Sequence, residues 1–132
     1  MISNLKPGIE NKLRREVTKK DIASNYGPEH MPVLSTSKIV AFMEYTALSS
    51  VQTFLPEGYS TVGTQINIFH EKPVLEGESV TCHSRLTDTE GRKLVFEISL
   101  RNDYDLIAHA THTRIIIKNE AFERMILRDN ED

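Results

Sequence analysis

Glu44 is the residue with the clearest capacity for chemistry, because an acid stands where the surrounding pattern predicts an apolar side chain. Residues 34–55 are predicted to form one long helix, in which Val40, Ala47 and Val51 recur at helical spacing around Glu44. This spacing predicts that Glu44 points with the buried stripe of the helix. A buried carboxylate is unfavourable unless it is paired, hydrogen-bonded or protonated. Glu44 is therefore either a structural acid with a satisfied partner or a catalytic acid.

His70 and Thr36 are the side chains best placed to act with Glu44. A lone histidine near a strand end, as His70 is predicted to be, is a surface or packing residue in most proteins. If that strand packs on the helix, His70 and Glu44 share one cleft, and a carboxylate beside an imidazole can orient a general base or activate water. Thr36 either caps the helix or turns its hydroxyl toward a substrate carbonyl or a water. If both Thr36 and Glu44 are helical, they lie ~12 Å apart along the axis, so joint action requires a bend at Thr36 or a second subunit.

The remaining candidates are a glycine, two histidines and the single cysteine. Gly63, at the start of the next predicted strand, is either a bulge or turn residue or a point where a backbone N–H is open to a ligand. His109 and His112 resemble a metal pair, but an offset of three in a strand puts them on opposite faces, so no metal site is expected. Cys82 alternates with apolar residues and is expected to be a buried structural thiol. The sequence contains no zinc motif, nucleophile elbow or Gly-rich phosphate loop.

A long helix followed by a run of strands must position these residues. Ser35 and its hydroxyl neighbours can cap the helix, and a Pro-Glu-Gly run at 56–58 ends it. The apolar period then changes to two, which predicts four strands, at residues 61–72, 78–89, 93–102 and 105–118. Compact turn signals at residues 90–91 and 102–103, between the last three predicted strands, favour an antiparallel meander. The other predicted elements are a strand at 9–20, a short helical turn at 21–26 and a short amphipathic helix at 120–128.

These elements predict an α+β domain in which the long central helix packs on one face of an antiparallel sheet. The chain has 132 residues, which fits one domain spanning 1–132. With so few helices, an edge or a face of the sheet needs cover, and dimerisation is the economical way to supply it.

Composition excludes several classes of function. A net charge of -3 gives no electrostatic case for binding nucleic acid. No apolar run approaches the ~20 residues needed to cross a bilayer, so no membrane partner is expected. The N-terminal residues lack the apolar centre of a secretory signal, and the single cysteine fits a reducing compartment, so a cytoplasmic location is expected.

The ordered set of motifs resembles the hotdog-fold acyl-CoA thioesterases, and within them the fluoroacetyl-CoA thioesterase-like group. The motifs, over residues 8–125, are STSKIVAFMEY, VGTQINIFH, GESVT, EGRKLVFEI and AHATHTRIII. The resemblance implies a hotdog fold, a long helix wrapped by an antiparallel sheet, in a homodimer with sites near the subunit interface. It also implies a catalytic threonine, glutamate and histidine, and Thr36, Glu44 and His70 match the family's residue types and its intervals of eight and twenty-six. Gly63 matches the family glycine that lies against the thioester.

The resemblance implies hydrolysis of an acyl-CoA thioester. Glu44 is expected to act as nucleophile or as general base on water, His70 to orient or protonate, and Thr36 to hold substrate or water. A backbone N–H near Gly63 is expected to stabilise the oxyanion. No metal or bound cofactor is expected, because CoA enters as part of the substrate.

Two features of the sequence bear on specificity and on the rival functions. Residues 29–33 lack the aromatic lid of the specialised family members, which favours a general short-chain acyl group over fluoroacetyl. The helix also lacks the Asp-x4-His pattern of the enoyl hydratases, so dehydration is not expected. The alternatives are a non-catalytic hotdog domain that binds an acyl-CoA or related metabolite, and a structural dimer in which Glu44 is a satisfied buried acid.

Overall fold

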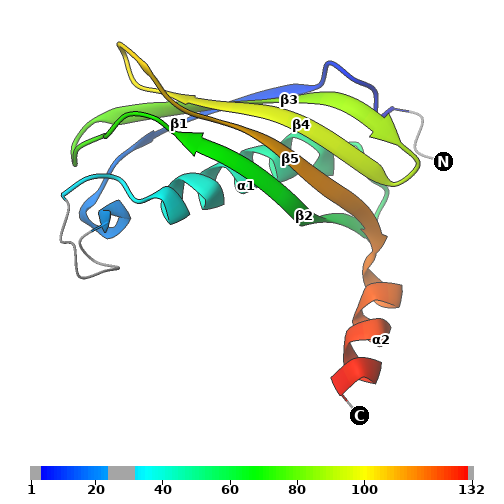
Figure 1. The fold of residues 1–132 in the computed structure, drawn as a ribbon. Coiled ribbons are helices and arrows are strands. Elements are labelled where there is room, and N and C mark those ends of the chain that lie inside the picture. The colour runs from blue at the N-terminus through cyan, green and yellow to red at the C-terminus, as the bar shows by residue number, and fades with distance from the viewer. Residues whose placement is uncertain (1–3, 24–31, 131–132) are drawn as a thin grey trace.

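The fold is one antiparallel sheet with a long helix on one face and a short helix beyond the sheet (Figure 1). The computed structural model describes residues 4–23 and 32–130, with the backbone alone at 129 and 130. The elements, in chain order, are β1 (Glu10–Glu16), a 3₁₀ turn η1 (Lys19–Asp21), α1 (Thr36–Gln52), β2 (Tyr59–His70), β3 (Ser79–Glu90), β4 (Lys93–Arg101), β5 (Leu106–Lys118) and α2 (Asn119–Asn130).

The five strands lie in the order β1-β3-β4-β5-β2, and every neighbouring pair is antiparallel. The chain crosses from α1 to the far edge, so β2 is an edge strand that pairs only with β5 in the described part of the chain. Its register begins with Tyr59 opposite Lys118 and ends with His70 opposite Ala108. The α+β architecture predicted from the sequence, with a long helix wrapped by an antiparallel sheet, is confirmed.

Helix α1 begins at Thr36 because the Ser35 hydroxyl accepts a hydrogen bond of 3.2 Å from the Lys38 N–H. It ends at Gln52, three residues earlier than predicted, ahead of a turn in which Gly58 takes a φ of 88°. The sheet wraps around this helix (Figure 1). The core between them contains fully buried side chains from α1, β3, β4 and β5, namely Met43, Ala47, Val51, Leu86, Leu94, Phe96, Leu100 and Ile107.

The buried stripe of α1 is rotated relative to the sequence prediction. Thr46 and Ser50 are buried in it, since their hydroxyls donate to the Phe42 and Ala47 carbonyls at 2.7 and 2.6 Å. Glu44 therefore lies at the margin of the stripe, and 42% of its side chain is exposed. The expectation that Glu44 points with the buried stripe is wrong for the single chain.

The remaining boundaries differ only at element ends. Strand β1 is shorter than predicted, and β2 runs two residues earlier than predicted at both ends. The predicted turn at 21–26 is a 3₁₀ turn at Lys19–Asp21, and its residues 24–26 lie outside the described residues. The C-terminal helix predicted at 120–128 is present as α2.

Candidate active site

The first part of the site forms where Glu44, in the middle of α1, meets the backbone of β2 at Gly63. A Cβ atom at Gly63 would stand 2.7 Å from Glu44 Oε2, and 3.2 Å from both Arg114 Nη1 and His112 Cε1. Only glycine leaves room for this approach. The β2–β5 register shifts between Gly63 and Gln65, so Gly63 lies at an irregularity of the edge strand. This position fits both alternatives predicted from the sequence, a bulge or turn residue and a point where a backbone N–H is open to a ligand.

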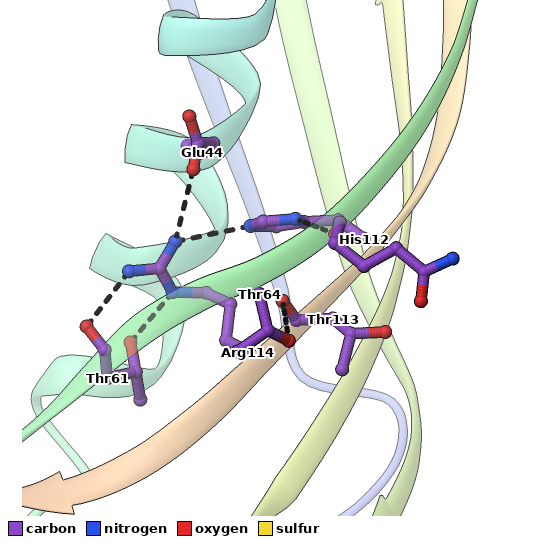
Figure 2. A network of polar contacts seen from close by, with 7 residues as sticks. Glu44, Thr61, Thr64, His112, Thr113 and Arg114 are labelled. Carbon is purple, nitrogen blue, oxygen red and sulfur yellow. Dashed lines mark hydrogen bonds and ion pairs between the residues drawn. The ribbon is translucent and has the colours of Figure 1, made fainter.

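Arg114 supplies a buried positive charge to this part of the site (Figure 2). Its Nε donates to Thr61 Oγ1 at 2.8 Å, and its Nη2 donates to the Thr61 carbonyl at 2.9 Å. Nη1 lies 3.9 Å from Glu44 Oε2, and only 5% of the Arg114 side chain is exposed. Burial lowers the pKa of Arg114 and the Glu44 charge raises it, yet a guanidinium stays protonated in proteins. The carboxylate of Glu44 thus faces a cation whose position two hydrogen bonds to Thr61 fix.

His112 completes this cluster, and its two contacts define which tautomer the neutral imidazole adopts. Its Nδ1 lies 2.8 Å from the Gln65 carbonyl, which can only accept, so Nδ1 carries the hydrogen. Its Nε2 is then an acceptor for Arg114 Nη1 at 3.2 Å. Burial lowers the pKa of His112, and the Arg114 charge lowers it further, against the raising effects of the Gln65 carbonyl and Glu44. His112 therefore links the irregularity of β2 to the guanidinium that faces Glu44.

The second part of the site joins the first residue of α1 to the last residue of β2. Thr36 Oγ1 lies 2.8 Å from His70 Nδ1, and His70 Nε2 lies 3.0 Å from the Lys72 carbonyl. Because that carbonyl only accepts, neutral His70 carries its hydrogen on Nε2, and Nδ1 accepts from the Thr36 hydroxyl. Thr36 is exposed and His70 is partly exposed. The imidazole nitrogen able to take a proton thus faces the Thr36 hydroxyl.

The chain brings Thr36 together with His70 and Glu44 together with Gly63, but the contacts of the described residues do not join the two pairs. Thr36 is the first residue of α1 and is capped by Ser35, so the chain does not bend away from the helix there. The separation of ~12 Å along α1 therefore stands. Of the two ways to unite Thr36 and Glu44 that the sequence left open, a second subunit remains.

Arg114 contacts Glu44 in the candidate site but was not predicted from the sequence, and His112 was considered only as a metal ligand. The two histidines do lie on opposite faces: His112 is buried, whereas His109 is partly exposed, stacks on Phe69 and lies 3.6 Å from Glu71. A usable signal was present in β5. Ala110, His112, Arg114 and Ile116 alternate on the inward face, so the strand period places a cation inside, where it requires an acid such as Glu44.

Other side chains bear less on the site. Cys82 is fully buried, and burial raises the pKa of its thiol to about 11, which makes it a poor nucleophile. No set of three or more His, Cys, Asp or Glu side chains suited to a metal ion occurs among the described residues. In the same part of the chain, no helix is both long and apolar enough to span a membrane.

Gly63→Ala is expected to lower turnover at least tenfold while leaving the fold intact. The added methyl group would stand 2.7 Å from Glu44 Oε2, the end of a flexible side chain, so the carboxylate moves rather than the strand. Steady-state kinetics and thermal unfolding would measure the two effects. Thr64→Ala, at the exposed neighbouring position, is the matched control, and equal losses in the two variants would contradict the role given to Gly63.

Comparisons with known proteins give consistent results. Residues 17–120 match the family model of the fluoroacetyl-CoA-specific thioesterases. The fluoroacetyl-CoA thioesterase of Streptantibioticus cattleyicolor is 30% identical over 98 residues, which cover 74% of this chain and 70% of that protein. A solved structure of a fluoroacetyl-CoA thioesterase superposes with a TM-score of 0.87 at 25% identity, covering 95% of this chain and 97% of that one.

Two further structures extend the likeness. A thioesterase superfamily member from Thermus thermophilus has a TM-score of 0.88 at 26% identity, over 96% of this chain and 93% of that one. A hot-dog-like protein from Thermanaerovibrio acidaminovorans has a TM-score of 0.89 at 19% identity, over 95% of this chain and 93% of that one, which shows the fold alone. The hotdog fold predicted from the sequence is confirmed.

Proposed function

Because this chain belongs to the family of fluoroacetyl-CoA-specific thioesterases, it is a thioester hydrolase acting on an acyl-CoA, and we propose that Thr36, Glu44 and His70 catalyse the hydrolysis. The observation that carries the proposal is the setting of Glu44. Its half-exposed carboxylate lies against Gly63 and 3.9 Å from the buried guanidinium of Arg114. A carboxylate that is open on one side can meet a bound thioester or a water, as a nucleophile or a general base must.

Two routes start from the Glu44 carboxylate. As nucleophile, it attacks the thioester carbonyl, the C–S bond breaks, CoA leaves as a thiolate, and water hydrolyses the resulting anhydride. As general base, it takes a proton from water, whose oxygen attacks the carbonyl directly. In both routes a backbone N–H near Gly63 stabilises the oxyanion. A thiolate is a good leaving group and needs no proton before the C–S bond breaks. The proton lost by the attacking water can reach the sulfur afterwards through His70, whose Nδ1 first accepts that proton and then donates it.

We propose that the active unit is a homodimer formed through β2. This edge strand is twelve residues long, and no described strand pairs with its outer side. A long unpaired edge is a template for another strand. Pairing about a two-fold axis sets β2 antiparallel to its copy, because the axis reverses the strand direction. The C-terminal end of one β2, with His70 and Thr36, then lies beside the N-terminal half of the other, near Gly63 and Glu44. Each site would take Glu44 from one protomer and the Thr36–His70 pair from its partner.

The substrate that fits the proposal is a small or short-chain acyl-CoA. Val40 and Leu48 lie one helical turn on either side of Glu44 and are partly exposed, so an acyl group at the carboxylate would meet two apolar side chains. Of the segment 29–33 that would form a lid, residues 29–31 lie outside the described residues, so the lack of an aromatic lid rests on sequence. We also propose that the protein works in the cytoplasm, which fits its single reduced cysteine.

An acyl-CoA panel tests the proposal. Purified protein would be assayed for release of CoA thiol from acetyl-, fluoroacetyl-, propionyl-, butyryl- and long-chain acyl-CoA. We expect turnover of the short chains, with no large preference for fluoroacetyl over acetyl. Thermal stabilisation by the same compounds without CoA release would contradict hydrolysis and support the non-catalytic binding domain.

A further inference from the structure

Helix α2 leaves the sheet at the end of β5 and projects toward the side on which α1 lies (Figure 1). Within the described chain it contacts mainly the end of β5. A helix of twelve residues is marginal in water without packing partners. The described part of the chain therefore gives α2 few of the contacts that such a helix needs.

The surface of α2 is more apolar than a solvated helix requires. Phe122, Met125 and Ile126 share one face, at the spacing i, i+3 and i+4. Met125 is 51% exposed and Ile126 is 43% exposed. Glu120 and Arg124, by contrast, form an exposed ion pair at 3.5 Å. Large apolar side chains grouped on an exposed surface mark an interaction site.

The position of α2 indicates what covers this face. Lys118, the last residue of β5, pairs with Tyr59, the first residue of β2, so α2 starts beside the N-terminal end of the free edge. In the dimer proposed above, the C-terminal end of the partner's β2 lies there. The partner's strand would be two strand spacings from β5, about 10 Å, and α2 is about 18 Å long. The helix is therefore long enough to reach the partner, and it projects to the side where the partner's α1 would lie.

We infer that α2 packs its apolar face on a second copy of this chain, beside the Thr36–His70 pair of that copy, and covers that end of its site. The inference rests on the proposed dimer. It accounts for two surfaces that the described residues leave exposed, the Met125–Ile126 face and Thr36. The cover would exclude bulk water from the proton-transferring pair.

Cysteine cross-linking tests the inference without reference to activity. The double variant Met125→Cys, Ser37→Cys would be treated with a short bifunctional maleimide, because Ser37 is exposed in the first turn of α1. We expect a covalent dimer on a denaturing gel. The matched control is Met125→Cys, Thr111→Cys, whose second cysteine lies at an exposed position on β5 and should give none. The natural Cys82 is buried and should not react.

A second variant measures the contribution to assembly. Ile126→Lys is expected to raise the dimer dissociation constant about tenfold, whereas Arg124→Lys leaves it unchanged; sedimentation velocity would measure both. Covalent dimer no more abundant than in the control, or cross-links within one chain only, would overturn the inference even if the protein is an active dimer. A protein that is monomeric throughout would overturn both the inference and the proposed dimer, whereas failure of the acyl-CoA panel would leave a positive cross-link standing.

Discussion

Glu44→Gln is expected to lower kcat about a thousandfold, the scale of losing a nucleophile or a general base. The amide keeps the size of the side chain but can neither attack a carbonyl nor take a proton from water. The fold should survive, because Arg114 keeps both hydrogen bonds to Thr61. The ion pair lost spans 3.9 Å and joins a half-exposed carboxylate to a buried guanidinium. Its loss should therefore lower stability by more than the ~1 kcal/mol of a surface pair, and by less than the ~3–5 kcal/mol of a fully buried one.

The measurement is kcat on the best short-chain substrate, with thermal unfolding of the same samples. Glu57→Gln, which neutralises an exposed acid in the turn after α1, is the matched control and should behave as wild type. If Glu44 is only a structural acid, its replacement will alter the unfolding temperature and leave turnover unchanged. That result would remove Glu44 from the mechanism.

Mixing two inactive variants is expected to restore activity, which is the largest gain that the dimer proposal predicts. Glu44→Gln and His70→Asn should each be nearly inactive alone. In a mixed dimer, Glu44 of the His70→Asn chain meets the intact Thr36–His70 pair of the Glu44→Gln chain, so one site of the two is whole. Random mixing makes half of the dimers mixed, and the expected recovery is about a quarter of wild-type activity.

The double variant Glu44→Gln, His70→Asn is the control for this experiment. Mixed with either single variant it offers no intact combination, so recovery should be absent. Chains carrying different affinity tags would show that subunits have exchanged. Proven exchange without recovery would place all three catalytic residues in one chain and contradict the composite site, although not the hydrolysis itself.

The elements of this fold could be predicted because their patterns are local. Leu94, Phe96, Ile98 and Leu100 alternate in β4, and all four are buried. The rotation of the α1 stripe could not be predicted in the same way. Thr46 and Ser50 look polar in sequence, but their hydroxyls bond to carbonyls of their own helix and can be buried. Helical spacing fixes which residues share a face, and tertiary packing decides which face is covered.

The contacts of the candidate site depend on register, which a single sequence does not supply. Arg114 on β5 pairs with Gly63 on β2 and reaches Glu44 Oε2 beside that glycine, next to the register shift between Gly63 and Gln65. The Thr36–His70 hydrogen bond requires β2 to end beside the first turn of α1. The resemblance to the family predicted Thr36, Glu44, His70 and Gly63 as site residues. The structure adds Arg114 and His112, which contact this site. Catalysis by the first three remains a prediction.

Helix α1 carries Thr36 at its first residue and Glu44 two turns later, and a helix is stiff over that length. In the proposed dimer, one α1 helix would contribute to both active sites, with Glu44 in one site and Thr36 in the other. A ligand that tilts this helix when it binds at Glu44 would also displace Thr36 in the other active site. The two centres would then be mechanically coupled, and occupancy of one would change the binding affinity of the other.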